Sequence, residues 1–293
     1  MTDNGNNPET KITARPVHRV RASGPILIVA ILFVVGSFLA WYFTWFGRGL
    51  SDAEITKYLS DYNHPRHVQH ALLQVQARME RGDKAAAQWY PHILALAGNP
   101  ETEFRLTAAW VMGSDQTSED FHNALKKLLA DEQPIVRRNA ALALVRFNDA
   151  TGRLELTAML KPFTLTSLVD GTLESSLSQG APVSRGTLLA RIRQPNNEIA
   201  ALRSPLTGTI DSLLVASGSS LTTGQPVLTI KSDEESVWEA LRALALVGTQ
   251  EDLKLVEDYA NGVLTSNDRL KQQAALTANA IKSRMNVNQK TMP

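Results

Sequence analysis

Three histidines spaced three residues apart form the pattern in this chain that comes nearest to a metal-binding motif. His64, His67 and His70 follow Asp61 closely in the sequence. Metal ligands on one helix usually lie three or four residues apart. Three steps of three residues drift round a helix, however, and Pro65 indicates that His64 stands at a helix start. We therefore expect surface histidines and predict no metal site. If a metal were bound, His64, His67 and His70 would be its candidate ligands.

Other catalytic patterns are absent from the sequence. It contains no Walker loop, Rossmann glycine string, nucleophile elbow or zincin motif, and no cysteine, which excludes disulfides and thiol chemistry. With 30 Lys and Arg against 29 Asp and Glu, the net charge of +1 gives no basic excess for binding nucleic acid. Trp89, Trp110 and Trp238 fall inside amphipathic patterns and are expected in the core. We predict a protein that is not an enzyme and has no cofactor and no nucleic-acid partner.

An uncharged run at residues 24–46 predicts a transmembrane helix. About 20 apolar residues cross a bilayer core as a helix, and the five aromatic residues that end the run suit the interface. Arg15, Arg19 and Arg21 precede the run, whereas Asp52 and Glu54 follow it. The positive-inside rule then predicts a single-pass protein with a cytoplasmic N-terminus and an extracytoplasmic body, periplasmic in a Gram-negative cell.

The alternative for this run is a cleaved signal peptide. A signal peptide has a shorter apolar stretch and small residues at its cleavage site, whereas bulky aromatic residues stand at that point here. An uncleaved anchor is therefore the prediction. Residues 1–23 are polar and aperiodic at their start and basic at their end, and they are expected to form a disordered basic cytoplasmic tail.

Two segments, residues 50–161 and 232–285, show helical periodicity and an internal repeat. Phe104-Arg105 followed by Ala108-Ala109 reappears 32 residues later as Val136-Arg137 followed by Ala140-Ala141. A proline-containing turn precedes each block, and the spacing predicts helical hairpins that stack into an α-solenoid because one hairpin cannot cover its own apolar face. Single helices are expected over residues 83–97 and 267–285, with a frayed tail at 286–293. An Ala-rich helical bundle is the alternative.

The segment from Asp131 to Leu144 resembles the second helix of a HEAT repeat. In that family an aspartate and an arginine help to lock neighbouring units together. The resemblance implies this role for Asp131 and Arg137.

Residues 162–231 interrupt the helical pattern with Gly, Ser, Thr and β-branched residues. Gly171-Thr172-Leu173 recurs as Gly208-Thr209-Ile210, 37 residues later, and the glycine turns that follow recur 38 residues later. Two intertwined four-strand halves would cover each other's apolar faces. Without this segment the helical repeat regains a period of about 32 residues. The β module is therefore predicted as an insertion in the turn of a repeat.

The string from Ser204 to Ile210, with Gly218 and the residues from Gly224 to Leu228, resembles the second half of a biotinyl/lipoyl domain, which is a barrel-sandwich hybrid. The carrier lysine of that family would fall near Asn197, where this sequence has no lysine. A module of this fold without the lysine resembles that of haemolysin-D-type membrane fusion and adaptor proteins. About a dozen residues separate the two halves here, too few for the helical hairpin of that family.

Together these patterns predict a multidomain α and β protein with a transmembrane helix, a HEAT-like α-solenoid and an inserted all-β barrel-sandwich module. The predicted function is a non-enzymatic, membrane-anchored scaffold or adaptor of the cell envelope. Protein partners would bind the helical repeats and the β module, and the resemblance suggests a transport or secretion complex. A degenerate carrier-like accessory subunit of a biotin- or lipoate-dependent enzyme complex is the alternative.

Overall fold

The computed structural model describes residues 24–44 and 49–291 of the chain. The predicted tail at residues 1–23 therefore lies outside the described residues. The chain divides into two compact units, Met1–Gly49 and Leu50–Pro293.

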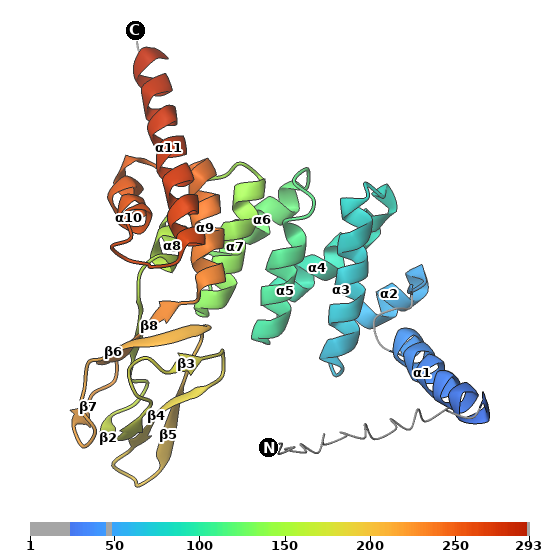
Figure 1. The fold of residues 1–293 in the computed structure, drawn as a ribbon, viewed down its shortest axis with the longest axis horizontal. Helices are drawn as coiled ribbons and strands as arrows, with labels where there is room; N and C mark the ends of the chain where they lie inside the picture. The colour runs from blue at the N-terminus through green and yellow to red at the C-terminus, as the bar shows by residue number, and fades with distance from the viewer. Residues whose placement is uncertain (1–23, 45–48, 292–293) are drawn as a thin grey trace, which may run out of the picture. The chain divides into compact units, whose positions relative to one another are not determined.

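The first unit contains helix α1 (Gly24–Thr44), which has no charged residue (Figure 1). Its side chains are described as far as Leu39, and large apolar ones among them are exposed, such as Phe33 at 76%. No helix in the described part of the chain has both the length and the apolar character needed to cross a bilayer. The span predicted at residues 24–46 reaches beyond that part, because residues 45–48 lie outside it.

The helices of the second unit follow one another as hairpins, in which a first helix packs against a second helix (Figure 1). The pairs are α2 (Asp52–Leu59) with α3 (Pro65–Glu80), α4 (Tyr90–Ala97) with α5 (Thr102–Met112), α6 (Glu119–Leu128) with α7 (Pro134–Arg146), α8 (Arg153–Met159) with α9 (Glu234–Val247), and α10 (Gln250–Ala260) with α11 (Asp268–Thr291). The second helices also contact one another in series, from α3 to α11. This arrangement is the predicted helical solenoid.

Local sequence signals explain where several helices begin. Ser51 forms a capping box with Glu54 at the start of α2, and the Asp233 carboxylate accepts a hydrogen bond from the Ser236 backbone N–H at the start of α9. Pro134 occupies the first turn of α7, where a missing backbone N–H costs no hydrogen bond. These caps lie close to the boundaries that the sequence predicts.

Two of the expected helices differ from the prediction. The single helix expected over residues 83–97 is a 3₁₀ helix, η1 (Lys84–Trp89), followed by α4. Pro91 cannot donate a backbone hydrogen bond to the preceding turn, so a continuous α-helical ladder cannot run through it. At the other end of the chain α11 continues to Thr291, through most of the tail that was expected to fray.

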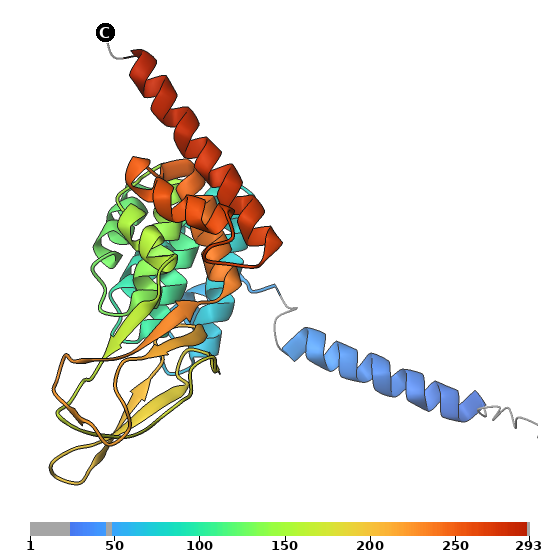
Figure 2. The same cartoon turned by 60° about the vertical axis from the view of Figure 1, so that its left-hand side comes forward.

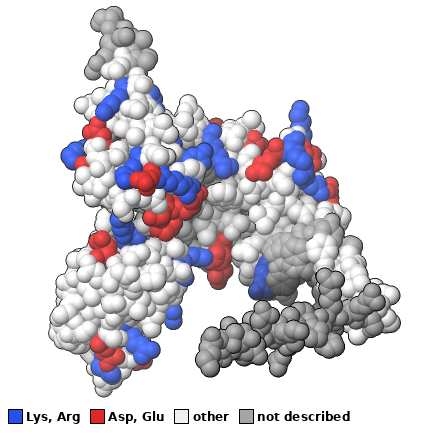
Figure 3. All heavy atoms as spheres, viewed as in Figure 1, with Lys and Arg blue, Asp and Glu red and all other residues white. Residues whose placement is uncertain are grey.

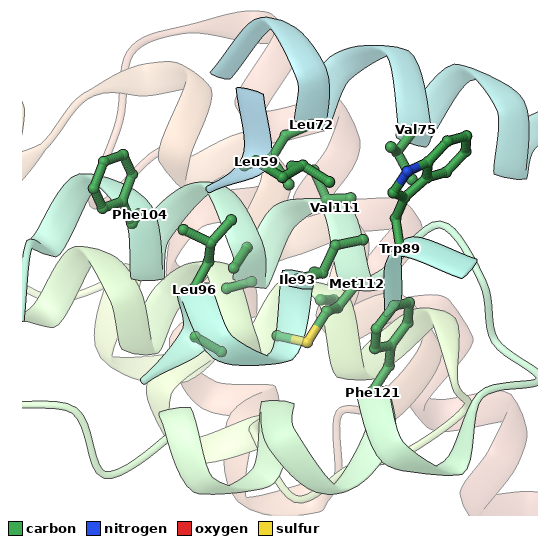
Figure 4. Close-up of a cluster of buried hydrophobic side chains, with 14 of the residues drawn as sticks. Leu59, Leu72, Val75, Trp89, Ile93, Leu96, Phe104, Val111, Met112 and Phe121 are labelled. Atoms are coloured by element: carbon green, nitrogen blue, oxygen red, sulfur yellow. The ribbon is translucent and has the colours of Figure 1, made fainter. Parts of the chain in front are cut away.

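A continuous apolar core joins the first three hairpins. Figure 4 shows side chains from α2 to α6 that meet between the helices, with Trp89, Phe104 and Phe121 among the largest that are fully buried. Alanines at the helix contacts, such as Ala108 and Ala140, are completely buried and allow the helices to approach closely. A second core cluster joins α7 to α11, so neighbouring hairpins bury their apolar side chains together.

Eight short strands lie between α8 and α9 (Figure 2). They are β1 (Phe163–Thr166), β2 (Gly171–Ser176), β3 (Pro182–Val183), β4 (Leu188–Arg193), β5 (Ile199–Arg203), β6 (Gly208–Leu213), β7 (Ser220–Leu221) and β8 (Pro226–Ser232). The described strands form two four-stranded antiparallel sheets, ordered β1-β8-β6-β3 and β5-β4-β2-β7, and no pairing among them closes a barrel. The two sheets share one apolar core.

The two halves of the β module are related by an approximate twofold symmetry. Strands β1 to β4 of the first half correspond to β5 to β8 of the second half. Exchanging each strand with its counterpart converts one sheet order into the other, and each sheet contains two strands from each half. Buried Ser167 and Ser204, 37 residues apart, bond in the same way to the backbone two residues ahead. Gly171 and Gly208 each pass so close to a neighbouring strand that a Cβ atom would overlap a carbonyl oxygen. The internal repeat of the sequence thus appears as a repeated structure.

The strands interrupt the helical series without separating α8 from α9. These two helices pack against each other, and the hydroxyl of Tyr259 in α10 donates to the Leu160 carbonyl oxygen at 2.9 Å. Two further contacts join the β module to the helical repeats: Arg185 in the β3–β4 loop pairs with Glu103 at the start of α5, and Lys231 Nζ of β8 donates at 3.0 Å to the carbonyl oxygen of Leu264 in the α10–α11 loop.

Candidate functional site

A hollow of about 210 Å³ lies along the second helices of three successive hairpins. We refer to it as the α5–α7–α9 groove. Its lining residues are Trp110 of α5, Asn139, Leu142, Ala143, Val145 and Arg146 of α7, and Glu239, Arg242, Ala243 and Leu246 of α9. Acidic and basic side chains gather on the face over α9 (Figure 3). The lining of the groove itself combines three charged side chains, Arg146, Glu239 and Arg242, with apolar ones.

Aromatic rings and guanidinium groups are paired in and beside this groove. The Arg146 guanidinium lies 5.4 Å from the ring centroid of Trp110, and the Arg242 guanidinium lies 4.6 Å from that of Trp238. Arg269 of α11 contacts the same Trp238 ring at 4.1 Å and also pairs with Glu235 at 2.8 Å. Stacking on an indole holds a guanidinium in place while its N–H groups stay available to a ligand.

Arg146 and Arg242 have no ion-pair partner within the described residues. The Glu239 carboxylate lies nearby, and its pKa is raised, first by burial and then by the negative charges of Glu235 and Asp233. The charges of Arg242 and Arg146 only partly offset this effect. The groove therefore holds two guanidinium groups and one carboxylate, with no ion pair as short as 4 Å between them.

The sequence prediction of a core position is wrong for Trp110 and right only in part for Trp238, which packs against the edge of the second core cluster. Trp89 is fully buried as expected, but Trp110 is 41% exposed and Trp238 is only partly buried. A helical pattern identifies an apolar stripe without saying whether a partner helix covers its edge. One sequence signal for the partly exposed Trp238 ring was Arg242, four residues later, because positions i and i+4 are neighbours on a helix surface and allow the guanidinium to stack on the indole.

The residues implied by the HEAT resemblance lie at the contacts between hairpins. Asp131, before α7, accepts two hydrogen bonds from Arg105 of the preceding hairpin, at 2.6 Å from Nε and 3.0 Å from Nη2. Arg137 donates to Glu155 of the next hairpin at 3.0 Å and to the Asp131 carbonyl oxygen at 2.9 Å. Asp131 and Arg137 thus form ion pairs across two successive contacts between hairpins. The sequence did not identify their partners, Arg105 and Glu155.

The candidate metal ligands separate into two groups. His64 Nδ1 lies 2.9 Å and His67 Nδ1 lies 2.8 Å from the carboxylate of Asp61, whereas His70 Nε2 lies 2.8 Å from Gln74 Nε2. Hydrogen bonds from His64 and then His67 lower the pKa of Asp61. Asp61, His64 and His67 therefore converge, and His70 does not join them.

The position expected for a carrier lysine falls on the β4–β5 hairpin. Asn197 stands in this turn with a positive φ of 68°, and its backbone N–H donates to the Gln194 carbonyl oxygen at 2.9 Å. Asparagine tolerates this left-handed conformation better than most residues. The turn therefore has a local structural reason for its asparagine.

Comparison with known proteins identifies the helical repeats. Residues 90–162 match the family model for HEAT repeats, which confirms the predicted repeats in this part of the chain. No curated protein matches the chain. Among solved structures, the chain is similar to one described as a single-chain, multi-domain long-chain acyl-CoA carboxylase, with 20% identity and a TM-score of 0.24. That alignment covers 34% of this chain and 9% of the carboxylase, and carries no argument about fold or function.

Proposed function

We propose that this protein is a non-enzymatic adaptor of the cell envelope that is anchored in a membrane and binds a protein partner in the α5–α7–α9 groove. The observation that carries the proposal is the chemistry of the groove: a half-exposed indole, two guanidinium groups without a carboxylate partner among the described residues, and exposed Leu246. Tryptophan and arginine are enriched at the residues that dominate interface energies. Solenoids present extended binding surfaces of this kind.

The partner segment that fits is acidic and carries an apolar side chain beside its carboxylates. Arg146 and Arg242 would donate to those carboxylates, and charge-assisted bonds from guanidinium to carboxylate are among the stronger hydrogen bonds in proteins. Trp110 and Leu246 would cover the apolar side chain. Two guanidinium groups, those of Arg146 and Arg242, line the groove against one carboxylate, that of Glu239, so the net charge of the groove favours an acidic segment.

The membrane anchor is proposed from the sequence of residues 24–46. This run carries no charge, and the large apolar side chains described in α1 are exposed. The arginines before the run and the acidic residues after it support a cytoplasmic N-terminus and an extracytoplasmic body. A transport or secretion complex in the envelope remains the expected setting for the partner.

The β module is proposed to be a second contact surface with a lysine-free, biotinyl/lipoyl-like barrel-sandwich fold. The two sheets, their shared core and their approximate symmetry support this assignment. The only lysine of the module, Lys231 at the end of β8, donates to the Leu264 carbonyl oxygen, and the β4–β5 turn has none, whereas a covalent biotin or lipoate carrier needs a lysine in that turn for its amide linkage. The alternative function, a degenerate carrier-like accessory subunit, predicts that a biotin- or lipoate-dependent enzyme co-purifies with the protein, whereas the adaptor proposal predicts that an envelope protein does.

Site-specific photocrosslinking of the full-length protein in its native membrane tests the adaptor proposal. A photoreactive residue at Leu246 should crosslink one protein, and an equally exposed control at Leu154 of α8 should not. Charge reversal at Arg146 and Arg242 should abolish the crosslink. The crosslinked segment should contain Asp or Glu beside an apolar residue. Equal crosslinking at both positions, or a basic segment in the groove, would overturn the proposal.

A further inference from the structure

The turn between α2 and α3 brings three potential metal-ligand atoms together. A carboxylate oxygen of Asp61 and one ring nitrogen each of His64 and His67 all lie within 4.8 Å of one another. The turn itself is tight, because the His64 backbone N–H donates to the Asp61 carbonyl oxygen at 3.0 Å and the His67 N–H donates to the His64 carbonyl oxygen at 2.8 Å. The backbone therefore sets the spacing of the three side chains.

We infer that Asp61, His64 and His67 form a binding site for a divalent transition-metal ion, with Zn²⁺ as the ion that fits best. A tetrahedral zinc centre has bonds of about 2.0–2.1 Å to nitrogen and oxygen, which separates its ligand atoms by about 3.3 Å. The distances of 2.8 and 2.9 Å between Asp61 and the two imidazoles are a few tenths of an ångström shorter. A small outward rotation of exposed rings creates the room for the ion.

The donor set decides which class of ion is bound. Two imidazole nitrogens and one carboxylate oxygen suit zinc and its neighbours among the transition metals, whereas Mg²⁺ and Ca²⁺ prefer sites made of oxygen atoms. Three protein ligands leave one tetrahedral position open. The His64 side chain is 65% exposed and that of His67 is 42% exposed, so water or a side chain of another protein can reach this fourth position.

A neighbouring ring holds one of the ligands in its orientation. Tyr58 of α2 stacks on His67 with ring centroids 4.3 Å apart and an angle of 10° between the rings. This contact restricts the imidazole plane, and outer contacts that orient a ligand commonly contribute 10- to 100-fold to metal affinity. Occupation of the site would tie the turn to the first residues of α3.

His70 is the matched control for this site. It lies on the same helix, three residues after His67, but its Nε2 lies beside Gln74 and it is not a member of the cluster. The inference therefore separates three histidines that share one spacing in the sequence.

Titration calorimetry of the untagged full-length protein in detergent with Zn²⁺ tests the inference. One ion should bind each chain, and a variant with both His64→Ala and His67→Ala should lose at least about 100-fold in affinity, whereas His70→Ala should not change it. Co²⁺ should give the visible absorption of a tetrahedral centre in the wild-type protein and in His70→Ala, but not in the double variant. Far-ultraviolet circular dichroism checks that each variant is folded. Failure to bind one ion, wild-type affinity in the double variant, or an equal loss in His70→Ala would overturn the site.

Discussion

Replacing Asp131 with asparagine should uncouple two neighbouring hairpins of the solenoid. The Asp131 and Arg105 side chains are only 6% and 10% exposed, and two parallel hydrogen bonds join them. Asparagine keeps the size of the side chain but removes its charge. The Arg105 guanidinium would stay buried, still bonded to the carbonyl oxygens of Asn99 and Pro100 at 3.0 and 2.8 Å. Its only remaining ion-pair partner among the described residues would be the 80% exposed Glu132, 3.9 Å from Nη2.

The magnitude follows from the burial of the pair. Removing one partner of a buried ion pair typically costs 3–5 kcal/mol, and the retained carbonyl contacts of Arg105 favour the lower end, about 3 kcal/mol. For a unit of this size, each kcal/mol lowers the melting temperature by roughly 2–4 °C, so a decrease of about 6–12 °C is expected. Replacing Arg105 with methionine as well should remove most of the penalty, because no charge then stays buried.

The pH dependence gives a second readout of the same contact. Burial acts to raise the pKa of Asp131, but hydrogen bonds from Arg105 and the Gln133 backbone N–H outweigh it and lower the pKa below its usual value. Because the folded-state pKa is lowered, the stabilisation is present above the unfolded pKa of about 4 and is lost as the pH falls through the folded value. The difference between wild type and Asp131→Asn should therefore shrink in acid.

Urea unfolding of the full chain in detergent, followed by tryptophan fluorescence, measures this effect. Trp89 is fully buried in the core of the first three hairpins, so its fluorescence reports when water reaches that core. Because solenoid stability depends on contacts between neighbours, the variant should also unfold with a broader transition. Asp258→Asn is the control, since Asp258 pairs with Lys254, which is 82% exposed, and the cost should stay below about 1 kcal/mol. Equal stability losses in the two variants would refute the reasoning.

Three further predictions concern other parts of the second unit. Burial opposes ionisation of Asp149, but its hydrogen bonds lower its pKa to about 2, so wild type should lose stability between about pH 4 and pH 2 in acid titrations, whereas Asp149→Asn should lose less. Gly208→Ala should destabilise the β module, because the new Cβ would overlap the Lys231 carbonyl oxygen, whereas Gly98→Ala, with its nearest contact at 3.8 Å, should unfold like wild type. Glu239→Gln should raise the melting temperature at pH 7 and lose this advantage below about pH 4, since the folded-state pKa of Glu239 is raised.

Local patterns in the sequence determined the positions of most helices and the division into repeats. A helix start depends on nearby residues, such as Ser51 with Glu54 or Pro134 in a first turn. The 32-residue repeat reflects the stacking of similar hairpins, and the match of residues 90–162 to HEAT repeats agrees with it. The paired glycines of the β module likewise predicted a duplicated structure, because each half needs the same tight turns and close strand contacts.

Only the tertiary structure decided which side chains meet between the hairpins. The sequence proposed Asp131 and Arg137 as locking residues, but the rotation of one hairpin against the next pairs Asp131 with Arg105, and Arg137 with Glu155. The same packing leaves Trp110 at the edge of a groove instead of in the core. Helical periodicity assigns a residue to a face of its own helix, whereas its partner depends on the packing of helices that are distant in sequence.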